Sequence, residues 1–171
     1  MSEAREIILT NGRLAIVDAS DFEWLSQWKW HHLRVCTCEY AVRREAEKSI
    51  LMHRAILGCA ADEECDHRDG SGLNNRRANL RKCTRQENMW NQRKRAGCTS
   101  RYKGVSWAPQ SRKWQAYIKG GGKQMHLGFF TSEIDAAHAY NAAASEMFGE
   151  FARLNEMPQE APDAQAIPDP R

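Results

Sequence analysis

The sequence lacks any run of 18 apolar residues, so it offers no helix that could cross a membrane. Its first twelve residues, MSEAREIILTNG, lack the basic start and the apolar core of a secretory signal peptide. We therefore expect a cytoplasmic protein. Six cysteines in 171 residues are too few for a disulfide scaffold, and we expect a cytosolic chain to keep them reduced.

Proline and net charge are also scarce, but both are unevenly distributed. Four of the five prolines lie in the last fourteen residues, which predicts a disordered acidic tail over residues 156–171. The net charge is only +3, yet residues 76–123 carry fourteen basic residues and a single acidic one, Glu87. Such a field attracts nucleic acid, and the aromatic side chains among these charges can stack on bases. A solvated basic surface is the alternative interpretation.

Residues 1–50 have the pattern of a small α+β unit. Asn11-Gly12 between two apolar runs predicts a hairpin, and Asp21 is expected to cap a short helix. The remaining core and strand positions predicted for this unit are Trp24, Trp28, Trp30 and the runs 40–44 and 49–52. Nothing in this segment indicates a function by itself.

Residues 51–92 predict the order strand, long loop, strand and helix. The pair Asp66-His67 ends the first strand and precedes a loop rich in Gly and Asn. Thr84 and Glu87 have the spacing of a capping box, which marks the start of the helix.

The polar residues of this segment suit phosphodiester hydrolysis. A neutral His67 can take a proton from water near pH 7, and the side-chain carbonyl of Asn79 can fix its tautomer. Asp66 and Asn88 offer a carboxylate and an amide oxygen, which are ligands that Mg²⁺ or Mn²⁺ accepts while water and phosphate fill its other positions. We therefore expect one such ion per active site.

This segment resembles the HNH nuclease family, in the variant of phage and intron homing endonucleases whose final histidine is asparagine. The resemblance covers roughly residues 50–92 and rests on Asp66-His67, Asp69-Gly70, Asn74-Asn75-Arg76, Asn79-Leu80-Arg81 and Asn88. It implies that His67 is the general base, that Asp66 and Asn88 bind the metal, and that Asn79 orients His67. His53-Arg54 matches a lead-in to the motif, for which we expect a structural or phosphate-contacting role. An inactive nuclease fold kept for binding is the alternative.

Some nucleases of this family hold structural zinc through paired Cys-x-x-Cys knuckles. The cysteines here stand at positions 36, 38, 59, 65, 83 and 98, and these spacings do not form that pattern. We expect no structural zinc and interpret the cysteines as small buried apolar residues.

Residues 101–155 predict a second module, joined to the first by a basic linker over 93–100. The expected elements are three strands over 101–107, 113–119 and 124–130 and a helix from about Ser132 to Phe148, ended by Gly149. Apolar residues alternate in the second and third strands, so one face of the sheet meets the helix and the other is free. A three-stranded sheet of this kind can enter the major groove and read base edges.

The second module resembles the plant APETALA2/ethylene-response-factor DNA-binding domain over its full length. The resemblance rests on Tyr102-Lys103-Gly104-Val105, Trp114-Gln115-Ala116-Tyr117-Ile118, Leu127-Gly128-Phe129, Ala136-Ala137-His138-Ala139-Tyr140 and Leu154-Asn155. By position, it implies DNA contacts from Lys103, Ser106, Arg112, Tyr117, Lys119, Gln124 and His126. Several of these positions hold other residue types in the plant domains, so the resemblance does not imply the DNA sequence recognised. A small domain that binds protein is the alternative.

The whole chain is thus expected to be α+β, with a small N-terminal unit, a ββα-metal nuclease module and a three-stranded antiparallel sheet packed on one helix. A nuclease module joined to a sequence-specific DNA-binding module predicts a site-specific endonuclease that acts on double-stranded DNA. Further DNA contacts are expected from Arg76, Arg77, Arg81, Arg93, Lys94, Arg95, Arg101 and Trp107. A homodimer, weak or formed on DNA, is left open. The alternatives are a DNA-binding regulator with a silent nuclease fold and a nonspecific phage nuclease.

Overall fold

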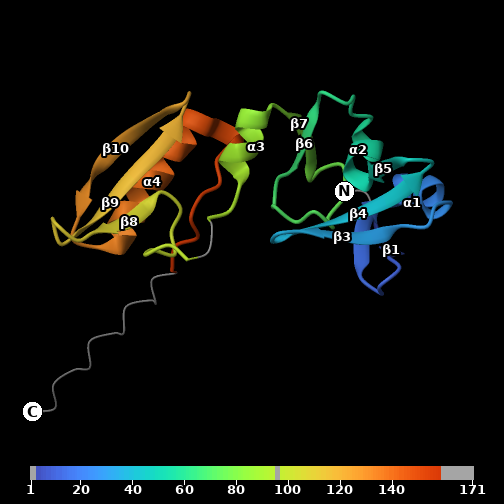
Figure 1. The fold of residues 1–171 in the computed structure, drawn as a ribbon, viewed down its shortest axis with the longest axis horizontal. Helices are drawn as coiled ribbons and strands as arrows, with labels where there is room; N and C mark the ends of the chain where they lie inside the picture. Colours follow the sequence, from blue (N-terminus) through green and yellow to red (C-terminus); the bar gives the residue numbers. More distant parts are fainter. Residues whose placement is uncertain (1–2, 95–96, 159–171) are drawn as a thin grey trace, which may run out of the picture. The chain divides into compact units, whose positions relative to one another are not determined.

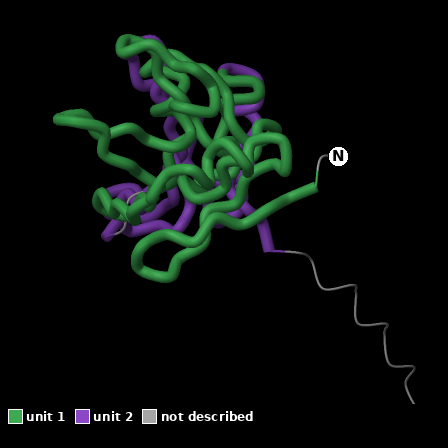
Figure 2. Tube along the Cα trace, turned by 90° about the vertical axis from the view of Figure 1, so that its right-hand side faces the viewer, with its two compact units in different colours: residues 1–93, 148–153 green, residues 94–147, 154–171 purple. Residues whose placement is uncertain are grey.

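The computed structural model describes residues 3–94 and 97–158, and this part of the chain is α+β (Figure 1). The chain divides into two compact units (Figure 2), one of residues 1–93 with 148–153 and one of residues 94–147 with 154–171. Most of the predicted disordered tail lies outside the described residues. No helix in the described ranges is long and apolar enough to cross a membrane.

The first unit begins with the predicted hairpin, formed by β1 (Ala4–Ile8) and β2 (Leu14–Asp18). Its turn is one residue longer than a two-residue Asn-Gly loop. The Gly12 amide donates to the Leu9 carbonyl at 2.9 Å, and the Leu9 amide donates to the Arg13 carbonyl at 2.8 Å. Gly12 has a φ of 81°, as a three-residue hairpin loop requires at this position.

Helix α1 (Ala19–Ser26) starts three residues before the predicted start, which had Asp21 as the N-cap. Asp18 occupies the N-cap position without a side-chain capping bond, so the prediction that Asp21 caps this helix is wrong. Asp21 is buried inside the helix, where it accepts a hydrogen bond from Nε1 of Trp24 at 3.1 Å. A buried carboxylate needs charged or hydrogen-bonding partners, and Arg77 supplies them from far along the chain.

Three antiparallel strands follow, β3 (His31–Val35), β4 (Cys38–Glu45) and β5 (Lys48–Leu51). The sequence predicted β4 and β5 but not β3. Helix α2 (Met52–Leu57) begins directly after β5, so Met52 starts a helix instead of ending a strand.

One hydrophobic core serves the whole first unit. Its buried members are Ile7, Leu9, Ala15, Val17, Leu25, Trp30, Ala41, Met52, Ile56 and Leu80. These residues come from both sides of residue 50, so the boundary predicted there does not divide the core. Trp24 packs against the core, but Trp28 is 42% exposed, and the prediction that it belongs to the core is wrong. The guanidinium of Arg43 lies 3.9 Å from the Trp28 ring centroid, a cation–π contact that suits a half-exposed indole.

The loop between α2 and the next strand is held by Arg54. Its Nη1 donates to the Glu63 carbonyl at 2.7 Å and its Nη2 to the Ala60 carbonyl at 2.5 Å, so Arg54 has a structural role. The same loop brings Cys59 and Cys65 together in a disulfide. The expectation that all cysteines are reduced is therefore wrong for this pair.

The predicted order strand, loop, strand and helix is confirmed by β6 (Glu64–His67), β7 (Leu80–Cys83) and α3 (Arg85–Asn91). Strands β6 and β7 pair antiparallel, and the Thr84–Glu87 capping box is present at the start of α3. Residues 148–153, which include the short 3-10 helix η1 (Gly149–Phe151), complete the first unit.

The second unit contains the antiparallel sheet of β8 (Val105–Ala108), β9 (Lys113–Gly120) and β10 (Lys123–Phe130), and most of α4 (Glu133–Phe148). The first strand is shorter than predicted because the chain turns at Gly104. This residue has a φ of 75°, and a Cβ atom there would lie 2.0 Å from the Tyr140 ring. Oγ of Ser132 accepts the amide of Ile134 at 3.1 Å, which fixes the predicted start of the helix.

Candidate active site

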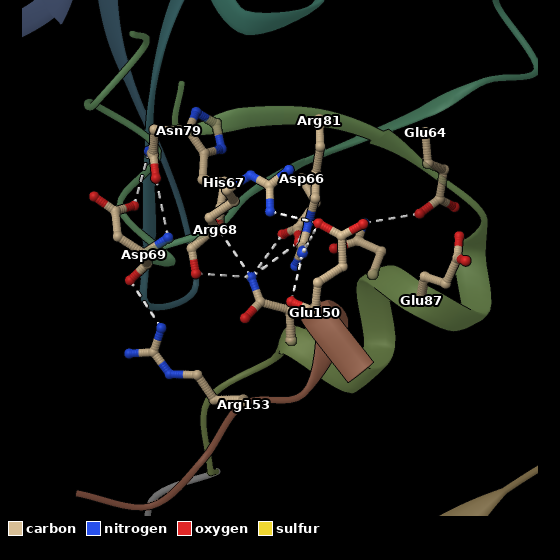
Figure 3. Close-up of polar contacts among 12 residues, drawn as sticks. Glu64, Asp66, His67, Arg68, Asp69, Asn79, Arg81, Glu87, Glu150 and Arg153 are labelled. Carbon is tan, nitrogen blue, oxygen red and sulfur yellow. Dashed lines mark hydrogen bonds and ion pairs between the residues drawn. The ribbon is translucent and has the colours of Figure 1, made fainter. Parts of the chain in front are cut away.

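A buried ion pair occupies one face of the β6–β7 hairpin. The register places Asp66 opposite Arg81, so both side chains lie on the same face. The Arg81 guanidinium donates to Oδ2 of Asp66 from Nη2 at 2.7 Å and from Nε at 3.0 Å (Figure 3). The side chains of Arg81 and Asp66 are only 6% and 8% exposed. A buried ion pair of this kind is costly to break, because either partner alone would leave an uncompensated charge.

Helix α3 supplies a side-chain amide to the Asp66 carboxylate. The amide belongs to Asn91 and not to Asn88, the residue that was predicted. Nδ2 of Asn91 lies 3.0 and 2.9 Å from the two oxygens of Asp66 and 2.8 Å from the His67 carbonyl. Asn88, one helical turn earlier, donates its Nδ2 to Oε2 of Glu64 at 2.8 Å. The prediction that Asn88 faces Asp66 is therefore corrected to Asn91. The physical reason is that successive turns of α3 lie beside successive residues of one face of β6.

His67 lies on the other side of β6, in a buried pocket of rings and amides. Its Nε2 is 3.4 Å from Oδ1 of Asn75, and its ring centroid is 4.8 Å from that of His53 in an edge-on arrangement. The Tyr40 ring lies 5.6 Å from His53 and 6.2 Å from His67. Burial lowers the pKa of His67 below its usual value, and burial also lowers the pKa of His53 to about 3. Both histidines are therefore neutral at pH 7, and a neutral imidazole can act as a base.

The residue beside His67 is Asn75, and this corrects the predicted contact from Asn79. Asn79 instead accepts the Asp69 amide at 3.1 Å and donates Nδ2 to Oδ1 of Asp69 at 3.0 Å and to the Asn74 carbonyl at 2.8 Å. It thereby ties the two ends of the loop together, and that loop carries Asn75.

Docking of the loop on other strands decides which asparagine reaches His67. The Asn75 amide donates to the Ile16 carbonyl at 2.7 Å, and the Ile16 amide donates to the Leu73 carbonyl at 2.8 Å. Gly72 lies against β4, where a Cβ atom would be 2.1 Å from the Glu39 carbonyl oxygen. Only glycine permits this approach, which holds the loop beside the Tyr40 ring of the pocket.

The sequence is similar to those of two viral proteins. The protein named Uncharacterized HNH endonuclease L560, of Acanthamoeba polyphaga mimivirus, is 30% identical over 152 residues, which cover 85% of this chain and 76% of that protein. The chain belongs to the HNH endonuclease family. Protein 3.8 of Escherichia phage T7 is 34% identical over 89 residues, 52% of this chain and 73% of that protein. No family model matches the sequence, and no solved structure matches it.

The HNH site has the donor types of a divalent metal centre, although Asp66 is already engaged. A carboxylate and asparagine side-chain oxygens are hard ligands, which suit Mg²⁺ or Mn²⁺. Within the described ranges, no group of three or more His, Cys, Asp or Glu residues could hold a metal. The oxygens of Asp66 accept from Arg81 and Asn91, so a cation at Asp66 competes with these contacts.

Several arginines predicted to contact DNA hold the HNH unit together instead. Nε of Arg76 donates to Oδ1 of Asp18 at 3.1 Å, and the Arg77 guanidinium donates to both oxygens of Asp21 at 2.7 and 2.8 Å. Asp18 and Asp21 are buried, which explains why they recruit basic partners from the following loop. Arg81 has the same structural function at Asp66, so the three predicted DNA contacts would have to compete with internal ion pairs.

The predicted linker residues also make internal contacts. Nη2 of Arg93 donates to the Asp69 carbonyl at 3.3 Å. Nζ of Lys94 donates to the Tyr102 carbonyl at 2.5 Å and to the Val105 carbonyl at 2.7 Å, and burial lowers its pKa. The ammonium of Lys94 thus satisfies two carbonyls of the fold, and the predicted contact with DNA would have to displace them. Arg95 lies outside the described residues.

The second unit keeps one face of its sheet apart from its core. Residues that pair across strands or alternate along them share a face, and the predicted DNA-contacting residues on this face are Ser106, Tyr117, Lys119, Gln124 and His126. Nε2 of Gln115, on the same face, donates to Oγ of Ser106 at 2.9 Å. Val105 and Ala116 lie on the opposite face, in a core with Ala136 and Ala137 of α4.

The other DNA-contacting residues predicted in the second unit lie elsewhere. Trp107 lies on the face of the sheet that packs against α4, and its ring centroid is 5.1 Å from that of Trp114. Its predicted place on the opposite, DNA-facing side of the sheet is therefore corrected. Lys103 precedes β8, and Arg112 lies at the β8–β9 turn with a φ of 50°. The Arg101 guanidinium is 4.9 Å from the centroid of the Tyr102 ring.

Sequence reasoning did not assign three residues that contribute to the HNH site. Asn75 was part of the quoted Asn74-Asn75-Arg76 match but received no role. Asn91 lies three residues after Asn88 on the same helical face, which is a signal that the spacing contains. Arg68 follows His67 and forms an ion pair with Glu150, 82 residues later in the chain, which no local signal indicates.

Proposed function

We propose that this HNH endonuclease is a site-specific DNA endonuclease that requires a divalent metal ion. The observation that carries the proposal is His67, which is buried, neutral and held beside Asn75 at the end of β6. An acceptor oxygen near Nε2 favours the tautomer with hydrogen on Nε2, which leaves the lone pair on Nδ1. Nδ1 is therefore the atom that takes a proton from water.

The proposed reaction is hydrolysis of a phosphodiester bond. The oxygen of water bonds to phosphorus while His67 takes the proton, and the bond between phosphorus and the 3′ oxygen breaks. The 3′ oxygen takes a proton from solvent. The products are a 5′-phosphate and a 3′-hydroxyl.

We propose one Mg²⁺ or Mn²⁺ ion per active site, held by the Asp66 carboxylate with a side-chain oxygen from Asn88 or Asn91. When bound, such an ion stabilises the charge of the phosphate and of the leaving oxygen. The Asp66 carboxylate accepts from Arg81 and Asn91, so the ion has to share its oxygens with these donors or displace them.

For the second unit we propose an APETALA2-type role in reading double-stranded DNA. The free sheet face supports this proposal, because it presents Tyr117 opposite His126 and Lys119 opposite Gln124 across β9 and β10. Such side chains can contact base edges and phosphates in the major groove. Tethering this reader to a small nuclease would supply the affinity and register that the nuclease lacks, as in a homing endonuclease.

Incubation with supercoiled plasmid and Mg²⁺ tests the nuclease. Discrete nicked or linear products that require both the metal and His67 are expected, with no cutting in EDTA or by His67→Ala. The variant should still bind the plasmid. Full activity of His67→Ala would overturn the assignment. A folded, DNA-binding chain that never cuts would favour a regulator with a silent HNH fold.

Site preference has to be tested without removing the second unit. Residues 148–153 belong to the first unit, so a truncation at residue 98 would damage the nuclease as well. Tyr117→Ala with Lys119→Ala is the better test, because both lie on the free sheet face. We expect cleavage to lose its discrete pattern while the nicking rate on nonspecific DNA changes little. An unchanged pattern would favour a nonspecific nuclease.

One active site cuts one strand at a time. We propose that a monomer nicks DNA, and that a double-strand break needs two sequential nicks or a homodimer that is weak or forms on DNA. Sedimentation of the chain with and without a cleavable duplex distinguishes these cases.

A further inference from the structure

Residues 148–153, here called the return segment, are packed against the HNH elements although they follow the helix of the second unit in sequence. The Phe148 ring stacks on Trp90 with centroids 4.4 Å apart. The Phe151 ring lies 3.9 Å from the Arg81 guanidinium, and Nη1 of Arg153 donates to the Asp69 carbonyl at 2.9 Å (Figure 3). The return segment therefore covers one side of the hairpin that carries the active site.

Within this segment, the Glu150 carboxylate lies between two guanidinium groups. Its Oε2 is 2.5 Å from Nη1 of Arg68 and 3.7 Å from Nη1 of Arg81 (Figure 3). The main-chain carbonyl of Glu150 accepts from Nη1 of Arg81 at 2.6 Å. A carboxylate and a phosphate offer arginine the same paired oxygens, so a place that holds one can hold the other.

The two arginines differ in how readily they can change partners. Arg81 is buried and committed to Asp66, whereas the side chains of Arg68 and Glu150 are 46% and 58% exposed. An exposed ion pair contributes little to stability and is screened by salt. Arg68 is therefore the exchangeable cation of this site. Its partner Glu150 also lies 3.7 Å from Arg81, which is bonded to Asp66, so a phosphate bound to Arg68 would lie on the side of the hairpin that carries the proposed metal ligand.

We propose that Arg68 is a phosphate-binding residue of the nuclease site and that Glu150 occupies it in the absence of DNA as an internal competitor. This inference rests on the proposed function, because it takes DNA as the ligand. Binding of DNA replaces the Glu150 carboxylate on Arg68 by a backbone phosphate. The return segment stays attached through Phe148, Phe151 and Arg153, which do not depend on that ion pair.

Binding of a labelled duplex in EDTA, measured against salt concentration, tests the proposal without any cutting. Glu150→Gln removes the competing charge and keeps the shape of the side chain. We expect it to tighten binding, because the phosphate no longer has to displace a carboxylate from Arg68. The slope of log K against log[salt] should stay the same, because Arg68 neutralises one phosphate in both chains, and Arg68→Ala should lower that slope by about 0.9.

The matched controls separate this site from a general effect of charge. Glu146→Gln removes an equal charge from an exposed position of α4, and we expect a smaller effect on binding and no change in slope. Arg68→Ala should weaken binding, and in the double variant Glu150→Gln should no longer strengthen it. Thermal melts should show all variants folded, since the exchanged pair is exposed.

Three outcomes would overturn the proposal. Glu150→Gln could behave like Glu146→Gln, it could weaken binding, or it could strengthen binding equally in the Arg68→Ala background. Each would mean that Arg68 and Glu150 only fasten the return segment. If the wild-type chain binds no DNA in EDTA and cuts none in Mg²⁺, the proposed function fails together with this inference. DNA binding with no Glu150 effect overturns this inference alone.

Discussion

Replacement of Asn75 by alanine tests whether this asparagine orients the general base. Asn75 is fully buried, and its Oδ1 lies 3.4 Å from Nε2 of His67, at the long end of hydrogen-bond distances. A neutral hydrogen bond contributes about 0.5–1.5 kcal/mol, and the long distance places this one near the lower end, at about 0.5–1 kcal/mol. If this energy holds the reactive tautomer, the nicking rate should fall about 2- to 5-fold.

The same variant should remain folded, because within the described part of the chain Nδ2 of Asn75 has no hydrogen-bond partner, so the side chain loses only its contact with His67. Asn79→Ala is the matched control. It removes hydrogen bonds to Asp69 and Asn74 and should cost about 1–3 kcal/mol of stability. Single-turnover nicking and urea denaturation of both variants separate the two effects. A wild-type rate for Asn75→Ala, with a large loss of rate in a fully stable Asn79→Ala, would refute the reasoning and restore Asn79 as the orienting residue.

Three further predictions concern stability. Arg81→Met leaves the buried Asp66 carboxylate without its charged partner and should lower the free energy of unfolding by about 3–5 kcal/mol, measured by urea denaturation. A smaller loss would mean that water reaches the carboxylate. The pKa of His53 is about 3 in the folded chain against 6.5 in a free histidine, so the unfolded chain binds the extra proton between these values. The free energy of unfolding should therefore be highest above pH 6.5 and fall by about 1.4 kcal/mol per pH unit below it. His53→Phe should reduce this dependence on pH. Gly104→Ala combines a strained positive φ with a clash against Tyr140 and should destabilise the second unit by more than about 2 kcal/mol in thermal melts.

Local signals in the sequence predicted most of the elements. The Thr84–Glu87 box, the turn glycine at position 12 and the cap at Ser132 each depend on a few neighbouring residues, so they can be read without tertiary information. The order of the HNH elements follows from these turn and capping signals together with the apolar runs. Strand β3 lacked such a signal, because it alternates weakly and carries histidine and arginine.

The contacts of the site depend on packing over long sequence separations, and these could not be predicted. Asn75 rather than Asn79 reaches His67 because its loop is fastened to Ile16, almost sixty residues earlier. Asn91 rather than Asn88 reaches Asp66 because the start of α3 relative to β6 sets which helical turn lies beside the carboxylate. Residue types and spacing therefore predicted the segment that carries the candidate site, whereas docking of the loop and helix decided which side chains are partners.

The basic character of residues 76–123 overstates the charge that is available to DNA. Arg77 and Arg81 are paired with buried carboxylates, and Lys94 is bonded to two carbonyls. Exchanging these contacts for phosphates would leave buried groups unpaired, which costs more than a surface phosphate contact returns. We therefore expect Arg77→Met to leave the slope of log K against log[salt] unchanged, provided that the variant stays folded. Lys119→Ala, on the free sheet face, should lower that slope by about 0.9. Equal slope changes in both variants would mean that the internal ion pairs open when the chain binds DNA.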